Sequence, residues 1–201
     1  MANRFAKIVT SLLATFLLVS VSWVLLCRFV PVRWTPLMTI RQYEAKQAGH
    51  TLHTQQKWVS LEDISPTLID AVLQSEDAFF YEHSGFEWDA IVGAYRRNRA
   101  MGYIVAGGST ISQQTAKNVF CTLHRTYTRK AFETYFTLLI ELLWGKERIL
   151  EVYLNVIELG KGIYGVEAAC QNRYGHSARY TTTNEAYDIA HSIPCPLWDK
   201  W

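Results

Sequence analysis

The chain of 201 residues is long enough for one domain with a sizeable core and an appended segment. Its formal net charge of +2 is too small to indicate a nucleic-acid-binding protein. The four cysteines show no CxxC spacing, which argues against a zinc knuckle or a thioredoxin-like motif and leaves disulfide pairing open: Cys27, Cys121, Cys170 and Cys195.

The N-terminal segment predicts a membrane anchor. Residues 8–27 contain no charged side chain, and a helix of that length spans roughly 30 Å, the hydrocarbon thickness of a bilayer. A cleaved signal peptide would have a shorter apolar core and a small-residue cleavage site, which the residues before Arg28 do not offer. We therefore expect a retained transmembrane helix after a cytoplasmic N-terminus of residues 1–7. Basic residues flank both ends of the span, so an N-terminus inside the cell is inferred from the large domain that follows.

The rest of the chain is predicted to be mainly α-helical. Residues 28–57 indicate a membrane-proximal connector that prolines interrupt, with a short helix ending at Gly49. Residues 58–201 form the predicted soluble domain, in which strand signals are few and short. The expected helices cover residues 66 toward 85, 88–99, 110 onward, 128–144, 146–159 and 166–174, with a turn at 160–165 and a last helix capped by Asn184 and ended by Pro194 and Pro196.

The apolar run at residues 136–144 is too short to be a second span. It also contains Glu141, so a buried core helix is the better interpretation.

The stretch GGSTISQQTAKNVF, residues 107–120, predicts a ligand-binding helix start. Glycines allow close approach of the backbone, and the free N–H groups of a helix N-terminus bind anions. A capping box at Thr110 and Gln113 places the start near Thr110. Thr110, Gln113, Gln114 and Lys117 then share one face, which suits phosphate and sugar oxygens. The alternative is a solvated polar face with an ordinary cap.

Two acidic residues end the first helix of the domain. If Glu76 and Asp77 are partly buried, the pKa of a carboxyl group there would rise, which suits a general base or acid. The alternative is an acidic pair in water at the end of a helix. His83 precedes Gly85 and is expected to make a structural hydrogen bond.

Arg129 and Glu133 are four residues apart and can pair on one helical turn. Such a pair contributes little on a surface, but in an active site Glu133 would orient Arg129 toward an anion. The arginines within residues 96–99 are expected in solvent or on anionic lipid headgroups. His50 and His53 lack a nearby cysteine or acidic companion, so a zinc site is not expected there.

Five segments occur in a fixed order: EDAFFYEHSGF, GGSTISQQTAKNVF, RKAFE, KERILEVYLN and GKGIYGVEAA. Together they resemble the five motifs of the family 51 glycosyltransferases, which polymerise bacterial peptidoglycan from lipid II. The single anchor is similar to that of the monofunctional biosynthetic subgroup of Gram-negative bacteria. The resemblance covers about residues 58–169. It implies a lysozyme-like helical domain, hexosyltransferase activity, and a single-pass inner-membrane enzyme whose catalytic domain is periplasmic.

The resemblance also implies residue roles. Glu76 is the general base, Asp77 is the acid beside it at the substrate, and Glu133 is the second catalytic carboxylate. Arg129 serves the phosphates. The donor-binding residues of the second motif fall on Ser109, Gln114, Lys117 and Asn118. The fourth motif, expected to be mainly structural, falls on Arg148, Glu151, Tyr153 and Asn155.

The chemistry of such a polymerase agrees with these residue types. A sugar 4-hydroxyl is a poor nucleophile, so a carboxylate must accept its proton. The donor leaves as undecaprenyl diphosphate, whose developing charge needs lysine, arginine or a divalent metal. Direct displacement inverts the anomeric carbon. No cofactor is certain, and the alternative is a Mg²⁺ or Mn²⁺ ion at the diphosphate near Asp77. The expected partners are lipid II, the growing lipid-linked glycan, the membrane and cell-division or other peptidoglycan-synthesis proteins, but no nucleic acid.

Two stretches depart from the family pattern. Thr115 replaces a common leucine, and residues 170–201 fit the family only loosely.

Two other functions stay open from the residues alone. A lysozyme-like enzyme would use Glu76 as general acid, although it would not need Lys117 and Arg129. A non-catalytic cell-wall scaffold would not need Glu76 and Glu133.

Overall fold

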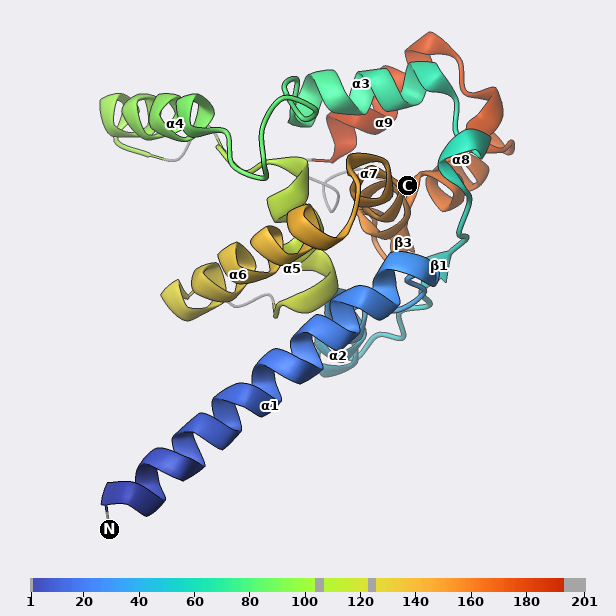
Figure 1. The fold of residues 1–201 in the computed structure, drawn as a ribbon. Helices are drawn as coiled ribbons and strands as arrows, with labels where there is room; N and C mark the ends of the chain where they lie inside the picture. Colours follow the sequence, from blue (N-terminus) through green and yellow to red (C-terminus); the bar gives the residue numbers. More distant parts are fainter. Residues whose placement is uncertain (1, 104–106, 123–125, 194–201) are drawn as a thin grey trace.

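The computed structural model describes residues 2–103, 107–122 and 126–193, and it is mainly α-helical, as predicted. One long helix, α1, extends away from a body that the other elements form (Figure 1). The elements in chain order are α1 (Ala2–Phe29), α2 (Pro36–Gln47), β1 (Gln55–Gln56), the short 3-10 helix η1 (Leu61–Asp63), α3 (Pro66–Glu76), α4 (Trp88–Met101), α5 (Ile111–Phe120), α6 (Tyr127–Leu143), α7 (Lys146–Val156), β2 (Glu158–Gly160), β3 (Ile163–Tyr164), α8 (Val166–Tyr174), a second 3-10 helix η2 (Ala178–Tyr180) and α9 (Thr183–Ser192).

Helix α1 carries the predicted span. Residues 4–29 are long and apolar enough to cross a membrane, and no other helix among the described residues passes that test. Its C-terminal half is fixed to α6 and the residue that follows it. The Ser20 hydroxyl lies 2.7 Å from the hydroxyl of Tyr135, and the indole of Trp144 donates to the carbonyl of buried Val24 at 2.9 Å. The anchor is therefore packed against the domain rather than tethered by a free linker.

Helix α2 confirms the short helix expected before Gly49. Thr35 caps it by accepting a hydrogen bond from the Met38 N–H. Pro36 occupies the first turn, where a missing N–H costs nothing, so it begins this helix rather than interrupting the segment. Gly49 follows in the left-handed region with φ of 77°.

The core surrounds α7, whose apolar stripe is fully buried. Ile149, Leu150 and Leu154 have no exposed surface, and each buried aliphatic side chain of this kind contributes about 1.5–3 kcal/mol. Helix α5 packs between α6 and α7, while α3 lies along α9. Three cysteines in the described part of the chain are buried and free: Cys27, Cys121 and Cys170. Cys195 lies outside the described residues.

The prediction of one helix over residues 146–159 was wrong at its end. Helix α7 stops at Val156, and β2 follows it and pairs antiparallel with β3, which pairs parallel with β1. The segment expected to be only a turn therefore contains strand β3. Gly162 and Gly165 have φ of 79° and 81°, which turns the chain back, so the Gly165 N–H reaches the Ile157 carbonyl at 2.8 Å. A helical period in the side chains cannot reveal this reversal.

The predicted cap of the last helix was also misplaced. Thr182, not Asn184, is the N-cap of α9, and the Glu185 carboxylate accepts its N–H at 2.8 Å in a capping box. The Thr-x-x-Glu spacing of Thr182 and Glu185 indicates this capping box in the sequence, but the prediction relied on the nearby Asn184 instead. Pro194 and Pro196, expected to end this helix, lie outside the described residues.

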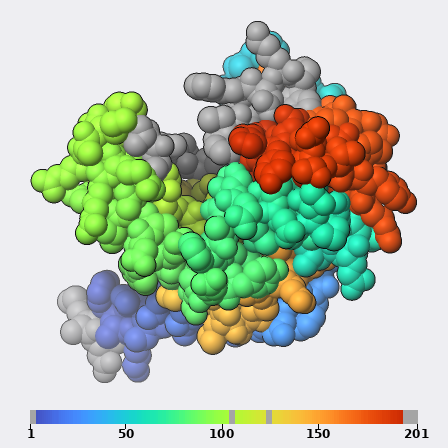
Figure 2. Space-filling model, turned by 90° about the horizontal axis from the view of Figure 1, so that it is seen from above, coloured from blue at the N-terminus to red at the C-terminus, as the bar shows by residue number. Residues whose placement is uncertain are grey.

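Helix α4 stands apart from the other helices. It forms a lobe of its own beside α3 and α9 (Figures 1 and 2), and Ala94 is its only buried side chain among those described. Its arginines are exposed, as expected for residues in solvent or at lipid headgroups: Arg96, Arg97 and Arg99.

Candidate active site

The start of α5 confirms the capping box. The Thr110 hydroxyl accepts the Gln113 N–H at 3.2 Å, and the Gln113 side chain accepts the Thr110 N–H at 3.0 Å. The same hydroxyl donates to the Gly85 carbonyl at 2.7 Å. Thr110 therefore joins the helix that carries the second motif to the loop that carries the first.

Asp77 and His83 form a buried unit behind this helix start. His83 Nδ1 accepts the Gly85 N–H at 3.0 Å, so Nε2 carries the proton and donates to Asp77 at 2.9 Å. The other Asp77 oxygen accepts the Ile111 N–H at 2.8 Å, at the N-terminus of α5, where the helix dipole stabilises an anion. The geometry fits the structural histidine expected from the sequence. It places Asp77, which is 4% exposed, behind α5 and not among the side chains that line the cavity.

Glu76 is held at the end of α3 by a relay of hydrogen bonds. The buried Tyr153 hydroxyl donates to Gln114 Oε1 at 3.3 Å, and Gln114 Nε2 donates to Glu76 Oε2 at 2.8 Å. Burial raises the pKa of Tyr153 well above its usual value, so this phenol remains a donor. Burial also raises the pKa of Glu76, although the Gln114 bond and the charge of Lys117 act in the opposite direction. A raised pKa makes the Glu76 carboxylate a stronger proton acceptor, which suits a general base.

A polar cavity of about 610 Å³ opens beside this relay. Its walls come from α2, α5, α6 and the residues just before α5. The lining residues are Ile40, Arg41, Glu44, Ser109, Gln113, Gln114, Lys117, Arg129, Lys130 and Glu133.

Three cations surround one buried carboxylate in this cavity. Glu133 is 2% exposed and accepts hydrogen bonds from Arg129 at 2.6 Å and Lys130 at 2.5 Å. The pair is therefore not the surface ion pair that the sequence left open. Burial lowers the pKa of Lys117, while the nearby carboxylates of Glu133 and Glu76 raise it. The group carries a net positive charge when Lys117 is protonated, so it can attract a polyanion.

Two contributions to the cavity were missed by the sequence analysis. Lys130 follows Arg129 and lies three residues from Glu133, a spacing that was available as a signal. Helix α2 supplies Arg41, which donates to Glu44 at 2.9 Å and to the carboxylate of Glu158 at 3.1 Å. These residues belong to the segment expected to be a connector, and only the folded chain brings α2 against α5.

Of the other two predicted donor-binding residues, one lines the cavity and one does not. Ser109 is exposed and lines the cavity. Asn118 is 7% exposed and lies in α5 away from the lining side chains. Of the predicted donor-binding residues, Ser109, Gln114 and Lys117 line the cavity, and their role in binding a donor stays a prediction.

The fourth motif makes structural contacts, as expected. The Asn155 side chain pairs with both the N–H and the carbonyl of Val59 at 2.9 Å. Arg148 donates to Glu151 at 2.6 Å and to the Cys27 carbonyl at 2.7 Å. This motif therefore ties α7 to the end of the anchor and to the segment before α3.

The residues near Asp77 do not fit a resident divalent cation. Both oxygens of Asp77 already accept hydrogen bonds from His83 and Ile111. Within the described ranges, no three His, Cys, Asp or Glu side chains come together as metal ligands.

Comparison with known proteins agrees with this geometry. A family model described as transglycosylase matches residues 44–199. The chain belongs to the transglycosylase family. It is a glycosyltransferase with the helical, lysozyme-like fold of that family. The matched range begins inside α2, the helix that supplies Arg41 and Glu44 to the cavity.

Several curated relatives are similar over most of their length, and each is named biosynthetic peptidoglycan transglycosylase. The protein from Bdellovibrio bacteriovorus is 49% identical over 90% of this chain and 72% of its own. The protein from Caulobacter vibrioides is 47% identical over 94% of this chain and 80% of its own. The protein from Bacteroides thetaiotaomicron is 44% identical over 96% of this chain and 77% of its own.

Proposed function

We propose that this transglycosylase polymerises lipid II into β-1,4-linked glycan strands, with Glu76 as the general base. One observation carries the proposal: Glu76 is hydrogen-bonded to Gln114, which lines the same cavity as Lys117 and Arg129. Glu76 itself is not among the residues that line this cavity, so Gln114 connects the proton acceptor to the wall that carries the anion-binding cluster. The names of the curated relatives support peptidoglycan as the product.

The reaction assigns one task to each group. Glu76 accepts the proton of the acceptor sugar 4-hydroxyl while that oxygen bonds to the anomeric carbon of the donor. The bond from that carbon to the diphosphate oxygen breaks, and its electron pair leaves with the diphosphate. Lys117 and Arg129 stabilise the charge that develops there. Attack opposite to the leaving group converts an α-linked donor into a β-linked product, and the proton on Glu76 then passes to solvent.

Glu133 serves this chemistry by holding cations. Its buried carboxylate bonds to Arg129 and Lys130, and without it two adjacent cations would repel each other and turn toward solvent. We therefore assign Glu133 the task of orienting the diphosphate-binding groups. Lysine and arginine side chains line the cavity and its wall, as far as the structure describes it, offers no metal site, so any Mg²⁺ or Mn²⁺ ion would arrive already bound to the diphosphate.

We infer that the catalytic domain is periplasmic and that α1 spans the inner membrane once. The C-terminal part of α1 is fixed to the domain through Val24 and Trp144, and α2, the next element in the chain, contributes part of the cavity wall. The site is thereby held beside the bilayer, where both lipid-linked substrates lie.

Incubation of the full chain in detergent with labelled lipid II tests the proposal. We expect glycan polymer that lysozyme digests, and loss of that polymer in Lys117→Ala. Clearing of purified cell walls without polymer formation would instead identify a hydrolase, for which the cationic cluster has no use.

A further inference from the structure

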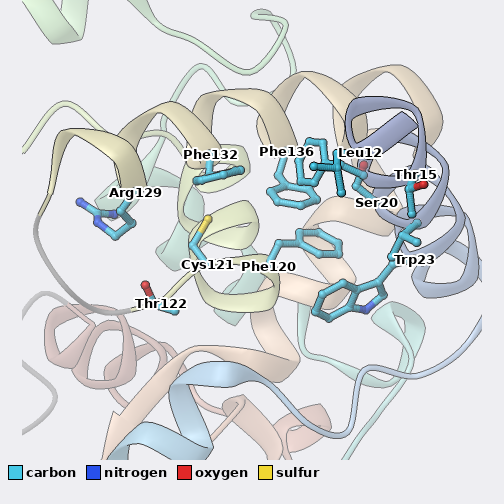
Figure 3. Close-up of a pocket in the computed structure, with 12 residues that line it drawn as sticks. Leu12, Thr15, Ser20, Trp23, Phe120, Cys121, Thr122, Arg129, Phe132 and Phe136 are labelled. Atoms are coloured by element: carbon cyan, nitrogen blue, oxygen red, sulfur yellow. The ribbon is translucent and has the colours of Figure 1, made fainter. Parts of the chain in front are cut away.

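A second cavity lies between the anchor and the catalytic domain. Its volume is also about 610 Å³, and its walls are mainly apolar. The face from α1 consists of Leu12, Thr15, Phe16, Val19, Ser20 and Trp23. The opposite face consists of Phe120, Cys121 and Thr122 at the end of α5 and Arg129, Phe132 and Phe136 on α6 (Figure 3).

Aromatic rings shape this cavity. The rings of Phe120 and Phe136 stack with centroids 4.7 Å apart, and Trp23 meets Phe120 edge-on at 5.4 Å. Phe16 reaches across from α1 to Phe132 at 5.9 Å. The α1 wall belongs to a helix that is long and apolar enough to cross a membrane, so an apolar chain suits this mainly apolar cavity better than water does.

Arg129 joins this apolar cavity to the polar one, since it lines both. Figure 3 shows it at one end of the apolar cavity, with Trp23 toward the other end. Its Nη1 is bound to Glu133, but its buried Nε has no hydrogen-bond partner among the described residues. A buried donor left unpaired is destabilising, so the arrangement favours a ligand that brings an anionic oxygen to this guanidinium.

We propose that this cavity binds the first isoprene units of the donor's polyprenyl chain, while the attached diphosphate lies on Arg129. This deepens the proposed function and rests on it. The occupant must have an anionic head for the polar cavity and an apolar, branched chain for the aromatic one. A polyprenyl diphosphate has both in one molecule, joined at the position where Arg129 stands. Glycan transfer would then occur with the chain held against α1 and α6, so that the anchor is part of the donor site.

Photolabelling tests the location directly. The full chain in vesicles of phosphatidylethanolamine and phosphatidylglycerol is irradiated with a polyprenyl diphosphate that carries a diazirine in the isoprene unit next to the diphosphate. We expect labelled peptides from residues 12–23 and 129–136, and loss of the label when unlabelled polyprenyl diphosphate is added. A phosphatidylglycerol with a diazirine in its acyl chain serves as the second arm. Equal labelling by that lipid, with no competition, would assign the cavity to bulk membrane lipid and overturn the proposal.

Kinetics of a matched pair of variants provide the second test. Phe132→Ala removes a wall of the cavity, whereas Leu138→Ala removes a similarly exposed apolar side chain from α6 outside it. We expect kcat/KM of Phe132→Ala to fall about tenfold for a long-chain donor and to stay unchanged for a donor whose diphosphate carries a methyl group in place of the polyprenyl chain. Leu138→Ala should match the wild type with both donors. An equal loss of Phe132→Ala with both donors, or no loss, would refute the chain-binding role.

The two proposals fail in different ways. Labelling of α1 and α6 by the diphosphate probe without any polymer from lipid II would leave the chain site standing and remove the polymerase function. Polymer formation with labelling of other segments would support the polymerase function and remove the chain site.

Discussion

Replacement of Asp77 by asparagine separates a positioning role from contact with substrate. In the wild type, Asp77 accepts one hydrogen bond from His83 at 2.9 Å and one from the Ile111 N–H at 2.8 Å. Asparagine keeps the shape but offers one acceptor and places an NH₂ group against the other donor. The loss of a charge-assisted hydrogen bond costs about 1.5–3 kcal/mol, and loss of the anion at the N-terminus of α5 adds up to about 1 kcal/mol. We expect the free energy of unfolding to fall by about 2–4 kcal/mol.

Urea unfolding in detergent, followed by tryptophan fluorescence, measures this change, and polymerisation of lipid II is assayed on the same sample. The control is Asp89→Asn, the same substitution at an exposed aspartate in the first turn of α4, where a cost below about 1 kcal/mol is expected. Activity of Asp77→Asn should fall together with stability because α5 carries Gln114 and Lys117. Unchanged stability with abolished activity would show that Asp77 contacts the substrate and would refute the positioning role.

Three further predictions concern the site and its supports. The base must be ionised, so activity should fall as the pH drops through the raised pKa of Glu76. The cation must be protonated, so activity should fall as the pH rises through the lowered pKa of Lys117. Lys117→Arg should move the alkaline limb of the rate profile upward, since a guanidinium stays charged; an unmoved limb would assign it to another group. Gly85→Ala, with φ of 89° and α6 side-chain atoms 2.9 Å from the new Cβ, should cost about 2–4 kcal/mol in urea unfolding. Gly49→Ala has a similar φ but open space and should cost only about 1–2 kcal/mol; equal costs would contradict the packing argument. Arg148→Met should loosen the anchor from α7 and speed limited proteolysis after residue 29, and an unchanged cleavage rate would show that this contact does not hold the anchor.

The sequence predicted the parts of the site that depend on short-range rules. The Thr110 capping box, the Arg129–Glu133 pair and the apolar stripe of α7 each follow from a spacing within one helix. The part that α2 contributes could not be predicted, because the contact of Arg41 with Glu158 joins residues 117 positions apart. Periodicity carries no information on such pairs.

The roles of the two acidic neighbours illustrate the same limit. Glu76 and Asp77 adjoin in sequence, and the resemblance to the family placed both at the substrate. Glu76 is the last residue of α3 and Asp77 is its C-cap, so the two side chains point in different directions. Glu76 accepts a hydrogen bond from Gln114, whereas Asp77 accepts hydrogen bonds from His83 and Ile111. The backbone conformation after α3 sets these directions, and it depends on the tertiary fold.

The base assignment is tested most directly by single-turnover polymerisation of lipid II with wild type and Glu76→Gln at saturating enzyme, with donor binding measured separately. Loss of a general base should slow transfer by about 10²–10⁴-fold while donor affinity stays within a few fold, since Lys117 and Arg129 remain in place. Transfer by Glu76→Gln at the wild-type rate would contradict the assignment of this carboxylate as the proton acceptor.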